Sequence, residues 1–186
     1  MMKKLLFCIV IALVCVTGIF AQSKRKTQSV AKSKTGIRSV DFRNFTYNNI
    51  GEENRVNLRK GRNLVKGEYS SGNYGSELGT VKYLDFDGDG KEEALVVVDY
   101  SQEAAGTNWS QHYFVFAYRN GAAQQIFHDS RYKSSGFRLS GKSLIVEAPF
   151  WKDNDAHCCP SLAETATYSW RNNKFVRVSQ KFKPWK

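Results

Sequence analysis

The sequence predicts a mainly β protein, an antiparallel meander of hairpins that forms a closed or two-layer sheet. Three observations support this fold class. Short runs of alternating apolar and polar residues, rich in β-branched and aromatic side chains, follow one another from Leu78 onward. Tight-turn sequences, among them Asn120-Gly121, separate these runs at short intervals. In this half of the sequence, apolar residues do not recur at the 3.6-residue spacing of an amphipathic helix.

The first residues have the features of an export signal rather than of a folded domain. Met1-Met2-Lys3-Lys4 is a short basic start, Leu5 to Val16 is an uninterrupted apolar run, and Ala21 offers a cleavage point. The apolar run is short for a bilayer span. We therefore expect residues 1–21 to be a signal peptide, with an uncleaved anchor as the alternative. The mature protein is predicted to be periplasmic, on the cell surface or extracellular, with no transmembrane span after signal cleavage.

The remaining chain has the length of one domain with a tail. Ser23 to Gly36 is polar, contains several lysines and has almost no large apolar residues, so residues 22–39 are predicted to form a disordered basic linker. Residues 40–186 are predicted to form a single β domain, which is an ordinary size for one hydrophobic core.

The elements of this domain are expected in chain order. Alternating residues suggest that ordered structure begins within Val40–Tyr47, and the glycines and serines of Ser70–Glu77 predict a loop. Four hairpins are then expected, from runs of β-forming residues on either side of short turns. The paired runs are Val81–Tyr83 with Ala94–Val98, Tyr113–Tyr118 with Ala122–His128, Phe137–Leu139 with Leu144–Val146, and Thr165–Trp170 with Phe175–Val178.

The first hairpin contains an acidic loop that predicts a calcium site. Calcium prefers six to eight oxygen ligands, and carboxylates at alternate positions of a tight loop can converge on it. Asp85, Asp87 and Asp89 occupy positions one, three and five. Lys91, at position seven, would offer its backbone carbonyl, and Glu93, at position nine, adds a fourth carboxylate. Carboxylates about 5 Å apart repel each other by roughly 3 kcal/mol at an effective dielectric constant of about 20, so their convergence favours a cation.

The loop differs from an EF-hand, because position twelve is Val96 rather than glutamate and a strand follows instead of a helix. Its pattern resembles the calcium-binding β-hairpin loops of FG-GAP and VCBS-type repeats, which run from D-x-D-x-D-G into a strand. The resemblance covers this hairpin only. A bound Ca²⁺ is expected to be structural rather than catalytic, because the sequence places no paired acid and base near the loop. The alternative is an open, solvated turn that binds no ion.

The second unusual stretch is a pair of adjacent cysteines near the C-terminus. Cys158 and Cys159 are the two cysteines that lie outside the predicted signal. Export to an oxidising compartment favours a disulfide between them. Two free thiols and a metal site that includes His157 are the alternatives, and His112 and His128 have no spacing that predicts a metal site.

These motifs together resemble exported proteins of the LppP/LprE type. The matching pieces are Asp85 to Val98, Cys158-Cys159-Pro160-Ser161 and Thr167-Tyr168-Ser169-Trp170, within a span from Leu78 to Val178. The resemblance implies export and a β domain, and it implies no particular reaction. Many members look like lipoproteins, whereas here Val14 occupies the position before Cys15 where a lipobox needs a small residue.

Charge and motifs leave three functions open. Removing the two lysines of the predicted signal from the net charge of +11 leaves +9, which favours an anionic envelope polymer or glycan as a partner. No nucleic-acid motif and no G-x-S-x-G, H-E-x-x-H or phosphate-loop motif occurs in the sequence. The first function is an exported, calcium-stabilised β binding module. The second is a redox-active or metal-binding envelope protein that uses Cys158 and Cys159. The third is a glycan-binding or glycan-acting protein with Tyr74, Trp109 and Trp151 as aromatic subsites.

Overall fold

The computed structural model describes residues 35–50, 54–65, 74–102, 108–132, 136–156 and 158–185. All of them belong to the compact unit Lys34–Lys186. The predicted signal peptide and residues 22–34 of the predicted linker lie outside the described residues. In the described part of the chain, none of the helices has the length and apolar character needed to cross a membrane.

The predicted mainly β, antiparallel fold is confirmed. Two short 3-10 helices, η1 (Ile37–Ser39) and η2 (Phe42–Asn44), precede the strands. A small sheet pairs β1 (Thr46–Asn48) with β2 (Arg55–Asn57). A five-stranded sheet contains β3 (Arg62–Val65), β4 (Tyr74–Leu84), β5 (Glu93–Gln102), β6 (Asn108–Arg119) and β7 (Ala122–Tyr132). A four-stranded sheet contains β8 (Gly136–Ser140), β9 (Ser143–Phe150), β10 (Leu162–Arg171) and β11 (Lys174–Pro184).

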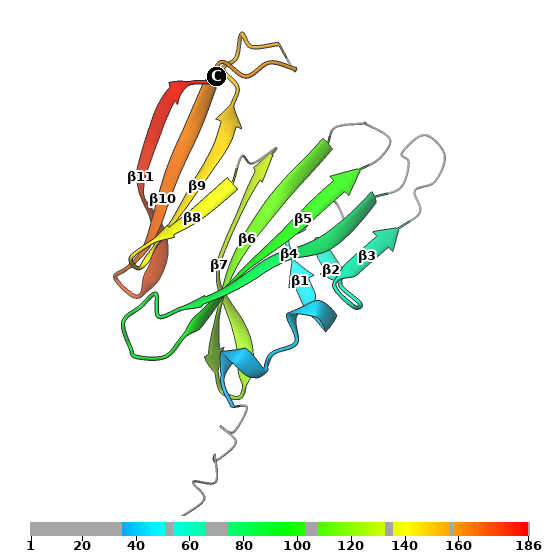
Figure 1. The fold of residues 1–186 in the computed structure, drawn as a ribbon, viewed down its shortest axis with the longest axis vertical. Helices are drawn as coiled ribbons and strands as arrows, with labels where there is room; N and C mark the ends of the chain where they lie inside the picture. Colours follow the sequence, from blue (N-terminus) through cyan, green and yellow to red (C-terminus); the bar gives the residue numbers. More distant parts are fainter. Residues whose placement is uncertain are drawn as a thin grey trace, which may run out of the picture. The chain divides into compact units, whose positions relative to one another are not determined.

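Both larger sheets are meanders. Strands that are neighbours in the chain are hydrogen-bonded neighbours in each sheet, and every pairing is antiparallel (Figure 1). All four hairpins expected from the sequence are present, in the expected order. Of the two arrangements predicted, a closed sheet is not found among the described residues, and the structure instead packs separate open sheets.

The five-stranded sheet is covered on both faces. Residues Ala94–Val98 of β5 are all buried, because alternate side chains enter two different hydrophobic clusters. On one face Val96 and Phe114 pack against the N-terminal segment, which contributes Ile37, Phe42 and Tyr47. On the other face a second cluster joins the five-stranded sheet to the four-stranded one, and its buried members are Phe86, Leu95, Val97, Tyr113, Val115, Leu144, Val146, Ala166, Tyr168 and Phe175. Burial on both faces explains why this strand reads as a continuous apolar run.

Two boundaries differ from expectation. Residues 74–77 belong to strand β4 rather than to a loop, so that part of the prediction is wrong. Tyr74–Glu77 pairs with β3 on one side and with β5 on the other, and these partners outweigh the weak strand propensity of glycine and serine. At the N-terminal end, Ile37 is buried in the core, three residues before the predicted domain boundary at residue 40.

Candidate functional site

The acidic loop connects β4 to β5 and is anchored by one aromatic side chain. Phe86 is 1% exposed and packs edge-on against Phe175, with ring centroids 5.2 Å apart. Phe175 belongs to β11, so this contact attaches the loop of the five-stranded sheet to the four-stranded sheet. The apolar residue between Asp85 and Asp87 therefore fixes the position of the carboxylates on either side of it.

The structure brings three of the predicted ligands together. One oxygen each of Asp85, Asp87 and Asp89 lies within 4.8 Å of the others, a spacing that would allow them to share a metal ion. Backbone amides organise these carboxylates. Asp85 accepts hydrogen bonds from the amides of Gly88 (2.6 Å) and Gly90 (3.3 Å), and Asp87 accepts from the amide of Asp89 (3.0 Å). Gly88 and Gly90 both have positive φ, 89° and 84°, which explains their place in this tight loop.

Two ammonium groups lie beside the aspartates. Lys91 Nζ is 3.6 Å from Asp89 Oδ2, and Lys142 Nζ is 3.6 Å from Asp85 Oδ2. Lys142 lies between β8 and β9, so it reaches the loop from the four-stranded sheet. Desolvation raises the pKa of Asp85, but the Gly88 amide and the Lys142 charge lower it more, and the pKa lies below its usual value.

Glu93 has a different place from the three aspartates. It is 3% exposed, and its Oε2 accepts a hydrogen bond of 2.8 Å from the Phe86 amide, so it holds the start of the loop from within. Desolvation raises the pKa of Glu93; the Phe86 amide opposes this, and the charges of Asp87 and Asp89 add to it. Of the five residues predicted to form the metal site, the structure brings together the carboxylates of the three aspartates. The Lys91 side chain is exposed, as expected for a residue that would offer only its backbone carbonyl, and Glu93 is buried.

Surface depressions lie on two sides of the loop. One, of about 340 Å³, lies between the loop and the N-terminal segment, where Arg38 pairs with Glu92 (Nη2 to Oε1, 2.7 Å). The other, of about 410 Å³, lies between the loop and the β10–β11 turn and is bordered by Trp170. Asp87, Asp89 and Arg119 border both depressions, so carboxylate and guanidinium groups face the same space.

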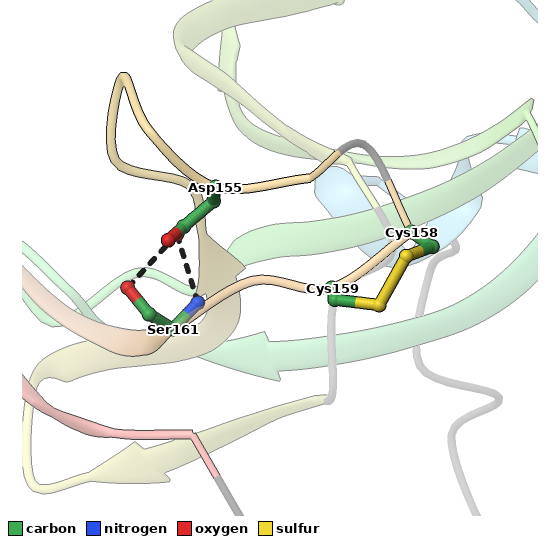
Figure 2. The surroundings of a disulfide bond; sticks show 4 residues. All are labelled: Asp155, Cys158, Cys159 and Ser161. Atoms are coloured by element: carbon green, nitrogen blue, oxygen red, sulfur yellow. Dashed lines mark hydrogen bonds between the residues drawn. A yellow bond between two sulfur atoms is a disulfide. The ribbon is translucent and has the colours of Figure 1, made fainter.

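The cysteine pair lies in the segment between β9 and β10. Cys158 and Cys159 form a disulfide with each other, and both residues are exposed (Figure 2). His157, the third residue of the alternative metal site, lies outside the described residues. Asp155 and Ser161 are hydrogen-bonded to each other across the base of this segment.

A histidine pair is a feature that the sequence did not predict. His112 Nδ1 lies 3.1 Å from His128 Nε2, the rings are stacked with centroids 5.4 Å apart, and Ser110 contacts the other nitrogen of His112 at 3.0 Å. Burial, then the neighbouring His128, lowers the pKa of His112 to about 4, and burial also lowers the pKa of His128. The pair forms when β6 and β7 associate, in a register that only the folded hairpin defines.

The sequence also did not predict a polar network between the two larger sheets. Tyr168 on β10 donates a hydrogen bond to Asp129 on β7 (2.6 Å) and accepts one from Arg131. Arg131 also pairs with Asp129 at 3.0 Å and lies 3.7 Å from Glu164. Burial, followed by the hydrogen bond to Asp129, raises the pKa of Tyr168. Arg177 Nη1 lies 3.5 Å from Glu164 Oε1, so the network contains two carboxylates and two guanidinium groups. The network links the sheets with paired charges.

Two of the predicted aromatic subsites, Tyr74 and Trp151, each pack against another aromatic ring. Tyr74 faces Tyr100 with ring centroids 6.5 Å apart, and Trp151 packs against Tyr132 at 5.6 Å. The side chain of Trp109 lies outside the described part of the structure. No protein-family model, curated protein or solved structure matches the chain.

Proposed function

We propose that the protein is an exported β binding module stabilised by calcium, with the ion held in the Asp85–Glu93 loop. The observation that carries this proposal is the approach of three aspartate carboxylates to within 4.8 Å of one another, on a loop anchored by Phe86 in the core between two sheets. Calcium takes carboxylate oxygens in flexible geometry, and these aspartates supply the charge that it prefers.

The proposed role of the ion is structural. The loop belongs to the five-stranded sheet, but Phe86 and the ammonium of Lys142 join it to the four-stranded sheet. A cation that draws the aspartates together would stiffen the loop and keep Phe86 in place. Without a cation, Lys91 and Lys142 provide the opposing charge, and they do so at exposed positions where ion pairs contribute little.

The proposed ligand is an anionic envelope polymer or glycan. Arg119 borders both depressions beside the loop, Arg38 borders one of them, and Trp170 borders the other. A bound Ca²⁺ would offset two of the three aspartate charges, so the guanidinium of Arg119 would contribute more to the potential of this surface. The net positive charge of the whole chain favours the same class of partner.

Calorimetric titration of the metal-free mature chain with calcium tests the proposal. We expect one ion per chain with a Kd of about 10⁻⁴ to 10⁻³ M, as in extracellular calcium modules. At about 100 times Kd the ion would add about 2.7 kcal/mol of stability, which raises Tm by roughly 5–10 °C. The double variant Asp87→Asn/Asp89→Asn should lose both effects, and Asp153→Asn, an exposed acid in another turn, should keep them. Absence of heat and of a Tm change at about 100 times that Kd would contradict the proposal.

Lys142 provides a second, independent test. If calcium displaces its ammonium from Asp85, then Lys142→Met should bind calcium more tightly, by about three- to ten-fold, because one competing charge is gone. Lys152→Met removes an exposed charge outside the acidic loop and is the matched control. Equal calcium affinity in the wild type and in Lys142→Met would show that the ion does not bind next to Asp85.

A further inference from the structure

The segment that carries the cysteine pair is closed at its base by a carboxylate. Asp155 Oδ2 accepts hydrogen bonds from the amide of Lys152 (2.8 Å), the amide of Ser161 (2.9 Å) and the hydroxyl of Ser161 (2.8 Å). The carbonyl of Ser161 in turn accepts from the amide of Trp185 at 3.0 Å, which ties the base to the end of β11. The ends of the segment are therefore fixed by hydrogen bonds.

The disulfide, by contrast, closes no loop of the chain. A disulfide stabilises a fold chiefly by restricting the unfolded chain, and this effect grows with the number of residues enclosed. Cys158 and Cys159 are adjacent in sequence, so they enclose none, and both are exposed rather than packed in a core. In Figure 2 the disulfide lies apart from the Asp155–Ser161 contacts that hold the segment. Neither cross-linking nor burial accounts for this bond.

A chemical role of the disulfide is the remaining explanation. An exposed disulfide can be attacked by an external thiolate, and its reactivity depends on access. We propose that Cys158–Cys159 is a reversible two-electron redox site that reacts with an exposed dithiol of another molecule. The hydrogen bonds of Asp155 to Lys152 and Ser161, here called the brace, hold the segment that presents it. This inference concerns a different part of the molecule from the calcium loop and does not rest on calcium binding.

The exchange proceeds in two balanced steps. A thiolate of the dithiol attacks one Sγ of the pair, the S–S bond breaks, and the other cysteine leaves as a thiolate that takes up a proton. The second thiol of the dithiol then loses its proton and attacks the sulfur of its own chain in the mixed disulfide, which releases the second cysteine. The dithiol is oxidised by two electrons and loses two protons, and the cysteine pair gains both.

The brace predicts how the two redox states differ. The hydrogen bonds of Asp155 involve Lys152 and Ser161 and not the sulfur atoms, so they persist when the S–S bond opens. The surrounding amides and the Ser161 hydroxyl lower the pKa of Asp155, which keeps this carboxylate charged and able to accept them. Reduction should therefore change the surroundings of Cys158 and Cys159 and leave the β domain folded. The brace should also favour ring closure, because it holds the chain on both sides of the cysteines.

Equilibration of the full chain with dithiothreitol as the dithiol tests the proposal, with the redox state read from intact mass after alkylation. We expect complete reduction to two alkylated cysteines in one chain, complete reoxidation by glutathione disulfide, and a Tm of the reduced protein within about 2 °C of the oxidised one. Asp155→Ala should shift the equilibrium toward the thiols by about five-fold or more, because the frame for ring closure is lost. Asp153→Ala, in the same segment, is the matched control and should leave the equilibrium unchanged.

Several results would overturn the proposal. The bond is a structural staple if it resists dithiothreitol until the domain unfolds, or if Cys158→Ser/Cys159→Ser lowers Tm by more than about 10 °C. The pair is not an intramolecular redox site if the reduced thiols reoxidise only between chains. Equal equilibria in the wild type and in an Asp155→Ala variant that keeps its fold would refute the role given to the brace.

Discussion

The stability of the protein should fall on mild acidification because of His112. This side chain is 6% exposed and its pKa is about 4, compared with about 6.5 for an ordinary histidine. One pKa unit corresponds to about 1.36 kcal/mol, so the full difference is worth about 3 kcal/mol of folding free energy. The ring contacts His128, Ser110, Tyr100 and Phe114, none of which is an acid. Burial and then the charge of His128 lower the pKa of His112, and together they outweigh a hydrogen bond with the Asn49 backbone, which raises it.

The lowered pKa of His112 determines how the free energy of unfolding changes with pH. The folded pKa lies below the unfolded one, so between pH 6.5 and pH 4 the unfolded chain binds a proton that the folded chain does not bind. The free energy of unfolding is therefore highest above pH 6.5 and decreases as the pH falls. Between pH 7.5 and pH 5 we expect His112 alone to remove about 2 kcal/mol. The lowered pKa of His128 acts in the same direction, while the raised pKa of Glu93 acts in the opposite one.

Urea unfolding at pH 7.5, 6.5, 5.5 and 5.0 measures this dependence. Aspartates and glutamates also titrate toward the acidic end, so the informative quantity is the difference between the wild type and His112→Gln. The variant should be less stable at pH 7.5, since it loses the contacts with Ser110 and His128, but its stability should fall by about 2 kcal/mol less on going to pH 5. The same pH dependence in both proteins would refute the explanation based on His112.

Two further predictions concern packing between and within the sheets. Tyr168→Phe removes the hydroxyl that is hydrogen-bonded to Asp129 and Arg131, so the free energy of unfolding should drop by about 1–3 kcal/mol. The control Tyr118→Phe should change it by less than about 0.5 kcal/mol. Equal losses of stability in urea unfolding would show that the hydrogen bonds between the sheets contribute nothing specific. Gly79→Ala should lower the free energy of unfolding by about 1–2 kcal/mol, because the new Cβ would lie 2.8 Å from Asp99 Oδ2. Introduced into the Asp99→Ala variant, the same substitution should lower it by half as much or less. An equal loss in both backgrounds would show that the clash is not with Asp99.

The meander could be predicted because its signals are local. Alternation, a β-branched run and a turn sequence such as Asn120-Gly121 each lie within a few residues, and they gave the four hairpins in the right order. The approach of Asp85, Asp87 and Asp89 could be predicted for the same reason, since all three belong to one tight loop. The inward position of Glu93 was not anticipated, because it depends on the burial of the loop against a distant sheet.

The histidine pair shows why other contacts could not be predicted. A two-residue turn at Asn120-Gly121 pairs Arg119 with Ala122, and an unbroken ladder from that pair would set His128 opposite Tyr113, on the face away from His112. The register shifts between Val115 and Phe116, which sets His128 opposite Phe114 and on the same face as His112. A bulge of one residue thus creates the pair, and the sequence carries no clear signal for its position.

The two candidate sites lie at opposite ends of one strand. The acidic loop borders Trp170 near the end of β10, and the braced cysteine segment precedes Leu162 at its start. Leu162 and Trp170 are eight steps apart along the extended strand, roughly 26 Å. Coupling between distant sites needs an element with two arrangements that both sites influence. Strand β10 is held between β9 and β11 along its length and pinned by Tyr168, so it offers no such second arrangement. Calcium affinity should therefore be the same with Cys158–Cys159 oxidised or reduced, and by reciprocity the redox equilibrium should not respond to calcium.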